Sequence, residues 1–236
     1  MFLILILSVL ENVTITVKIA NIIIKMMFNK SFLFLSFFGI VVFIMSVNCA
    51  FGSVSRLGSL FVCGRASLLG SSVSRVSVAG ARAIDQSSSR WLSDMVGGLS
   101  SGTAVVSGLA LGADTVAFKS ALARGLPCVA VLPSGFDNIT PRSNLGLARR
   151  IVKAGGVLVS AYPPSARASR GSFVARNQII AELGKFLIVP QFEVKSGTRH
   201  TVDFAQQANK LIVVQNANYS GNQFVLKSSK YNTIAK

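Results

Sequence analysis

VVSGLALGADTVAFKSAL, residues 105–122, runs from two valines through a glycine-rich turn into a helical pattern. The valines favour a strand, Ser107 to Gly112 supply a tight turn, and apolar residues recur at helical spacing from Ala113 onward. A short apolar strand that leads directly into a helix is half of a βαβ unit. This segment therefore predicts an α/β fold.

The same alternation recurs on both sides of this segment, from residue 76 to residue 214. Several of the strand candidates are apolar throughout, which is typical of strands covered on both faces. In the helix expected at 143–154, the residues Leu145, Ala148, Ile151 and Val152 form the stripe that should face the core. Short strands separated by helices indicate a doubly wound, mostly parallel sheet, an extended Rossmann-like α/β domain. We predict strands at 76–79, 103–106, 128–132, 157–160, 185–189 and 211–214, and helices at 84–99, 113–124, 143–154, 173–183 and 198–209.

An apolar N-terminal segment precedes this domain. Residues 31–47 are uncharged, with a length near the lower limit for a membrane-spanning helix that also fits a signal-peptide core. Translation from an internal methionine such as Met45 is a third alternative. We expect a cytoplasmic protein, or one anchored to a membrane through residues 31–47. The chain then divides into an apolar segment (1–50), a Ser/Gly-rich linker (51–75), the Rossmann-like domain (76–214) and a polar tail (215–236).

The chain is strongly basic: 24 Lys and Arg against 8 Asp and Glu give a net charge of +16. This balance favours a polyanionic partner, either nucleic acid or an anionic membrane surface, although a basic protein without a specific partner has the same composition. With three cysteines in no CxxC pair and one histidine, we expect no metal site and no cofactor. Cys128 lies in an apolar run and is expected to be a buried thiol.

Basic residues concentrate between positions 142 and 185, where aromatic residues are interleaved. A positive surface with aromatic side chains is the pattern that single-strand-binding proteins use, whereas a solvated basic face with core aromatics is the alternative. The aromatics are Phe136, Tyr162 and Phe173, and the basic residues are Arg142, Arg149, Arg150, Lys153, Arg167, Arg170, Arg176 and Lys185, against the single acid Glu182.

Small and polar residues directly follow each predicted strand. In open α/β sheets, ligands bind outside the carboxyl ends of the strands, and glycines there let backbone N–H groups and helix N-termini approach a phosphate. The alternative is that these glycines only make tight turns. The residues at this rim are Gly80 and Arg82, Ser107, Gly108 and Gly112, Gly135, and Ser196, Gly197 and Thr198.

Six segments together resemble the DNA-processing protein A (Smf) family: VSVAGAR (76–82), residues 105–122, AVLPSGFDNITPRSNLGLA (130–148), SAYPP (160–164), FVARNQIIAEL (173–183) and SGTRHT (196–201). Their order along the chain is that of the family. The resemblance implies a domain that binds single-stranded DNA without catalysing a reaction, helps load a RecA-type recombinase, and commonly forms homodimers. Arg82 matches the DNA-contacting arginine of the family. The resemblance also implies a pocket formed by Ser107, Gly108, Gly112, Asp114, Gly135, Asp137, Asn144, Arg176, Asn177, Ser196 and Gly197.

Departures from the family and two rival functions qualify this expectation. Ala161 stands where the family usually has Glu, and Gln178 where it often has Arg. Phosphoribohydrolases of the lysine-decarboxylase-like group have a similar architecture, but their Pro-Gly-Gly segment is missing here, and Glu193 precedes the Ser-Gly pair instead of following it. A sensor of a small nucleotide that signals through the N-terminal segment is the other alternative.

Overall fold

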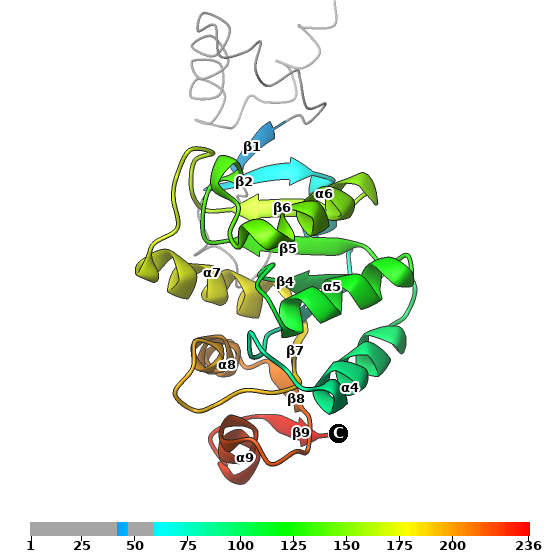
Figure 1. The fold of residues 1–236 in the computed structure, drawn as a ribbon, viewed down its shortest axis with the longest axis vertical. Coiled ribbons are helices and arrows are strands. Elements are labelled where there is room, and N and C mark those ends of the chain that lie inside the picture. Colours follow the sequence, from blue (N-terminus) through cyan, green and yellow to red (C-terminus); the bar gives the residue numbers. More distant parts are fainter. Residues whose placement is uncertain (1–41, 47–58) are drawn as a thin grey trace, which may run out of the picture. The chain divides into compact units, whose positions relative to one another are not determined.

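The computed structural model describes residues 42–46 and 59–236, which form one sheet of nine strands in the order β1-β2-β6-β5-β4-β3-β7-β8-β9 (Figure 1). All pairings from β6 across to β9 are parallel, and β2 joins β6 antiparallel at the other end. The strands are β1 (Val42–Ser46), β2 (Ser59–Gly64), β3 (Arg75–Val78), β4 (Ala104–Ser107), β5 (Cys128–Leu132), β6 (Val157–Ser160), β7 (Phe186–Val189), β8 (Leu211–Val214) and β9 (Thr233–Ala235).

Helices cover both faces of this sheet. The first three, α4 (Gln86–Gly97), α5 (Ala113–Ala123) and α6 (Leu145–Lys153), connect β3, β4, β5 and β6 in succession and lie on one face. After β6 the chain crosses through α7 (Arg170–Leu183) to β7, and α8 (Thr198–Gln207) and α9 (Ser220–Lys227) follow on the other face (Figure 1). Short 3-10 turns occupy Ala66–Leu69 (η2), Phe136–Asn138 (η3) and Arg142–Asn144 (η4). The predicted doubly wound, mostly parallel α/β fold is confirmed.

Apolar side chains of the strands make the core. One cluster joins β2, β4, β5 and β6 to Ile179 and Ile180 of α7, and a second joins β7 and β8 to α8 and α9. Cys128 of β5 is buried as expected, and burial raises the pKa of its thiol to about 12. In α6 one position differs from the predicted stripe, because Leu147 is buried and Leu145 is exposed. The helix begins only at Leu145, two residues after the predicted start at residue 143.

The sheet extends beyond the predicted range 76–214 at both ends. Residues 51–75, expected as a linker, contain β2 and η2, and Leu60 and Val62 of β2 are packed in the core. In the expected polar tail, residues 215–236 contain α9 and β9, with Val225 and Tyr231 buried. Both expectations are corrected, because apolar residues reach the core of the sheet from a segment otherwise rich in Ser and Gly (51–75) and from one otherwise rich in Asn and Ser (215–236).

Of the expected membrane segment at 31–47, only Val42–Ser46 belongs to the described residues, where it forms β1 paired antiparallel with β2. The remaining part of that prediction, and most of the apolar segment 1–50, lies outside the described residues. Among the helices of the described residues, none has the length and apolar character needed to cross a membrane.

Candidate nucleic-acid interface

The loops that leave β5, β4, β3 and β7 meet along one edge of the sheet, which we call the carboxyl edge. β3 and β7 are neighbours, yet α4 and α8 leave them on opposite faces, so the topological switch point lies between these strands. Their loops are tied together, because the Ala81 amide donates to the Gln191 carbonyl at 2.8 Å. Ligands of open α/β sheets bind at such a point.

Gly80 and Gly112 bring the loops after β3 and β4 together. A Cβ on Gly80 would lie 2.6 Å from the Cβ of Ala113. Gly112 has φ +69 and lies against the backbone of Ala81 and Arg82, and the Ala113 amide donates to the Ala81 carbonyl at 3.1 Å. Only glycine fits both the left-handed backbone and the contact at position 112. These glycines position the residues beside them.

A buried ion pair lies beneath the loop after β4. The Nη1 atom of Arg176, from α7, is 3.6 Å from Oδ2 of Asp114 in the first turn of α5, and both side chains are about 7% exposed. The same Oδ2 accepts hydrogen bonds from the amides of Gly108 and Ala110, each at 3.1 Å. Burial lowers the pKa of Arg176 from its usual value, Asp114 opposes the shift, and the nearby charge of Arg82 adds to it. Arg176 thus supports the loop from within, whereas the sequence placed it in the basic stretch 142–185 and the resemblance placed it in a pocket.

Ser107 and Asn144 also have structural partners. The hydroxyl of Ser107 is fully buried and donates to the Val78 carbonyl at 2.8 Å, so it does not face the rim as expected. The side-chain Nδ2 of Asn144 donates to the carbonyls of Leu109 and Ala110 at 2.9 and 3.0 Å. These bonds join the loop after β4 to the beginning of α6.

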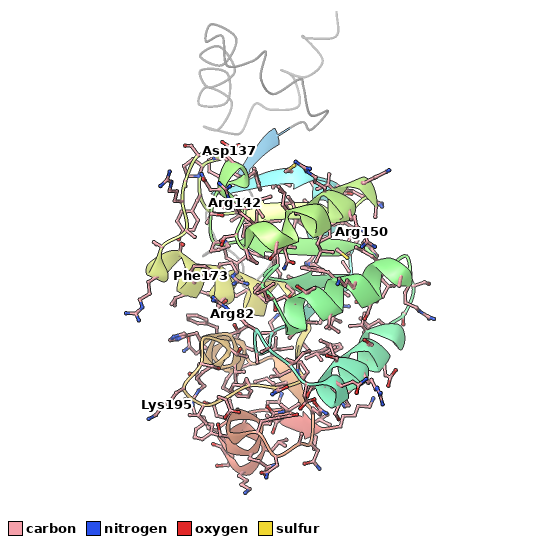
Figure 2. The ribbon with its side chains drawn as sticks, viewed as in Figure 1. Arg82, Asp137, Arg142, Arg150, Phe173 and Lys195 are labelled. Atoms are coloured by element: carbon pink, nitrogen blue, oxygen red, sulfur yellow. The ribbon has the colours of Figure 1, made fainter. Side chains whose placement is uncertain are left out.

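Arg82 differs from Arg176 in being exposed. Its guanidinium lies over the ring of Phe173, with Cζ 5.6 Å from the centroid, and that of Arg176 lies 6.0 Å from the same centroid. Within the described part of the chain, Arg82 forms no ion pair with Asp114 or Asp137. Phe173 therefore holds an exposed arginine, and the two residues lie close together in Figure 2. The sequence indicated Arg82 and Phe173 separately, but not the contact between them.

The remaining predicted residues lie in two places. Ser196, Gly197 and Thr198 begin α8, where Asn177 of α7 donates to the Gly197 carbonyl at 3.2 Å. The Ser196 hydroxyl is buried, with no hydrogen-bond partner among the described residues. Gly135 lies after β5, with no room for a side chain against the carbonyls of Pro163 and Pro164. Ser196, Gly197 and Thr198 therefore lie at the switch point. Gly135 lies in a close-packed turn further along the carboxyl edge, after β5.

The structure divides the basic stretch 142–185. Arg142 follows β5 and Arg170 begins α7, so both lie at the carboxyl edge. Arg150 and Lys153 are in the last turn of α6 and Lys185 precedes β7, which places them at the opposite edge because the helices run antiparallel to the strands. Figure 2 shows Arg142, Phe173, Arg82 and Lys195 along one side and Arg150 away from them. Lys195, next to Ser196 in the sequence, is an exposed cation of this edge that the sequence reasoning missed.

The carboxyl edge thus combines backbone amides, helix N-termini and exposed guanidinium groups, which together suit the phosphates of an extended polyanion. No group of three or more metal-ligating side chains occurs among residues 42–46 and 59–236. The fold is that of a Rossmann-like α/β domain, and its carboxyl edge is the candidate site.

Comparison with known proteins gives the family. Residues 56–230 match the family of DNA recombination-mediator protein A. The Smf protein of Synechocystis is 38% identical over 136 residues, which are 57% of this chain and 34% of that protein. DNA processing protein A of Streptococcus pneumoniae superposes with a TM-score of 0.73 at 24% identity, over 88% of this chain and 75% of that one. DNA processing protein A of Helicobacter pylori, whose structure describes a single-stranded DNA binding mode, superposes with a TM-score of 0.70 at 24% identity, over 84% and 92%.

The chain belongs to the DNA recombination-mediator protein A family. It spans about a third of the length of the Synechocystis relative. The resemblance read from the six segments is confirmed, and the enzyme and sensor alternatives are not favoured.

Proposed function

We propose that this protein binds single-stranded DNA along its carboxyl edge and acts as a recombination mediator. The observation that carries the proposal is the pair of arginines at Phe173. Arg176 is neutralised by Asp114 in the interior, whereas Arg82 is exposed and held on the ring without an ion pair among the described residues. A guanidinium that is already held in one position before binding loses less conformational entropy when it binds a phosphate.

The cations of this edge suit a strand that runs along the ends of several parallel strands of the sheet. The loops that follow β5, β3 and β7 carry Arg142, Arg82 and Lys195, respectively. The first turn of α8, with its backbone amide groups, begins near Lys195. Ser196 supports a phosphate site there, since its buried hydroxyl has no partner in the described residues. We assign phosphate contacts to Arg82, Ser196, Gly197 and Thr198. The other predicted site residues shape the loops that hold these four: Gly80, Gly108, Gly112, Gly135, Asn144, Arg176 and Asn177.

Titration of the full chain against labelled oligonucleotides tests the proposal. Single-stranded DNA should bind more tightly than duplex of the same length, and log affinity should fall with log salt by about 0.7 for each phosphate neutralised. Equal affinity for the duplex, or an affinity independent of salt, would contradict it. An Arg150→Ala variant is the matched control, because it removes an exposed charge from the opposite edge.

The mediator role includes a RecA-type recombinase as partner and a homodimer as the working form. Membership of a recombination-mediator family supports the recombinase partner. Strand exchange by a RecA-type recombinase, on DNA already covered by a single-strand-binding protein, should be accelerated by this protein. Sedimentation equilibrium should give twice the chain mass.

We also propose that the site works by binding alone. The carboxylate of Glu193, the acid nearest the Ser-Gly pair in sequence, accepts a hydrogen bond from Ser220 at the surface. Incubation with AMP should release no free adenine. Release that disappears in a Glu193→Ala variant would move the protein to the hydrolase class.

A further inference from the structure

Two exposed leucines lie at the carboxyl edge. Leu111, in the loop between β4 and α5, is 45% exposed, and Leu145, the first residue of α6, is 37% exposed. Phe224 and Ile234, the other large apolar side chains that are exposed in the described residues, belong to α9 and β9 at the far end of the sheet. The two leucines thus occupy the same edge as the arginines proposed to hold phosphates.

The loop of Leu111 is built to keep that side chain outside. Leu109 has φ 59, a left-handed backbone that a leucine rarely adopts, and its side chain is fully buried. The Asp114 carboxylate holds this conformation by accepting from the amides of Gly108 and Ala110. Strained backbone of this kind tends to occur at ligand-binding loops. Leu109 therefore anchors the loop, and Leu111 is presented to solvent at its tip.

Hydrogen bonds keep the two leucines on one surface. Asn144, the neighbour of Leu145, donates to the carbonyls of Leu109 and Ala110, which precede Leu111. On the other side of Leu111, Gly112 packs against the backbone of Arg82. Because the sheet order is β5-β4-β3, the loop carrying Leu111 lies between the loops carrying Arg142 and Arg82.

We propose that Leu111 and Leu145 form an apolar shelf that contacts the nucleobases of single-stranded DNA. This inference rests on the proposed function and adds its base-binding part. Unpaired bases expose flat, weakly polar faces, and a strand whose phosphates are held by Arg82 and Arg142 brings the bases between them over the leucines. The ring of Phe173 is less suited to this task, because Arg82 and Arg176 already lie over it.

The shelf has consequences for specificity. Leucine side chains have no hydrogen-bonding groups, so contact with them tolerates any base. In a duplex the faces of the bases are stacked on one another and cannot reach the shelf, which adds a preference for single strands that phosphate contacts alone do not give.

The test compares two strands with the same number of phosphates, oligo-dT and an oligonucleotide of abasic sites, against the full chain by fluorescence anisotropy. The unaltered protein should bind oligo-dT about tenfold more tightly than the abasic strand, which is the effect of burying one leucine-sized apolar surface. The double variant Leu111→Ala, Leu145→Ala should lose that difference and retain its affinity for the abasic strand. Phe224→Ala, an equally exposed apolar residue at the far end, should behave like the unaltered protein.

The outcomes separate the shelf from the function on which it rests. If the unaltered protein binds neither strand, the proposed function fails. If it binds both strands equally, or if the double variant keeps the preference for oligo-dT, the shelf is wrong and DNA binding through Arg82 stands. A double variant that becomes monomeric by sedimentation while keeping that preference would instead identify the leucines as a contact between copies of the chain.

Discussion

Gly108 and Arg176 occupy adjoining space: a Cβ built on Gly108 would coincide with the guanidinium Nη1 of Arg176. The backbone of the loop after β4 therefore rests directly on the buried arginine that α7 supplies. The absence of a side chain at position 108 and the presence of the ion pair with Asp114 are two parts of one arrangement.

Gly108→Ala should lower the free energy of unfolding by about 3 kcal/mol or more, because Arg176 must leave its place or the loop must lift away. Urea denaturation of the full chain measures this loss. Gly97→Ala, in α4, is the control, since nothing lies within 4 Å of its added Cβ. A loss at position 108 no greater than at position 97 would contradict the close packing.

Asp114→Asn should destabilise the protein by about 3–5 kcal/mol, because the buried charge of Arg176 loses its counter-charge while the amides of Gly108 and Ala110 keep an acceptor. Adding Arg176→Met should recover part of the loss, since no buried charge then remains. The same denaturation series measures both variants. If the double variant is as unstable as the sum of its single substitutions, the two side chains act independently.

Arg82→Ala should weaken binding of single-stranded DNA about tenfold, because charge-assisted hydrogen bonds to a phosphate contribute about 1.5–3 kcal/mol. Arg82→Lys should recover only part of this affinity, since an ammonium cannot bind two phosphate oxygens side by side or lie flat on Phe173. The melting temperature should be unchanged in both variants because Arg82 is exposed. An unchanged affinity with a lowered melting temperature would show that Arg82 holds the loops together instead.

Stability at low pH should depend on Asp85, the N-cap of α4. The pKa of Asp85 is lowered chiefly by the hydrogen bond from the Ser88 amide and further by that from Tyr219. A carboxyl whose pKa is lower in the folded state stabilises the fold above its unfolded pKa and loses this effect as the pH falls through the folded pKa. Asp85→Asn keeps the capping oxygen but not the charge. Its melting temperature should be below that of the unaltered protein at neutral pH, and the two should converge in acid.

If the difference between these two proteins persists unchanged below the folded pKa of Asp85, the charge is not its cause. The negative charge of Glu193 also helps to raise the pKa of the neighbouring Tyr219, the hydrogen-bond partner of Asp85. A parallel Glu193→Gln variant therefore separates the two carboxyl groups.

The sequence was sufficient to predict the parallel part of the sheet, because strands such as Cys128–Leu132 are apolar on both faces and each leads into a helix. It was insufficient for β2, whose antiparallel partner β6 lies far along the chain and whose Ser- and Gly-rich neighbours resemble a linker. The secondary-structure propensity of a segment does not reveal that it pairs with a strand far along the chain. The pairing depends on Leu60 and Val62 reaching the same core as Ile179.

For the site, the sequence located the rim residues but not the directions of their side chains. Ser107 points to the Val78 carbonyl and Arg176 to Asp114, whereas Arg82 remains exposed, and strand ends alone do not distinguish these cases. The basic stretch was predicted as one surface. It divides because a helix that returns antiparallel to the strands takes Arg150 and Lys153 to the opposite edge.

The antiparallel strand β2 also decides how the protein can be shortened. A fragment beginning at residue 76, where the alternating pattern starts, would lack Leu60 and Val62 and leave the backbone of β6 (Val157–Ser160) without its partner on that side. An apolar strand with open N–H and C=O groups pairs readily with strands of other molecules. Such a fragment should precipitate or form soluble aggregates during purification, whereas one that retains β1 and β2 should remain dispersed.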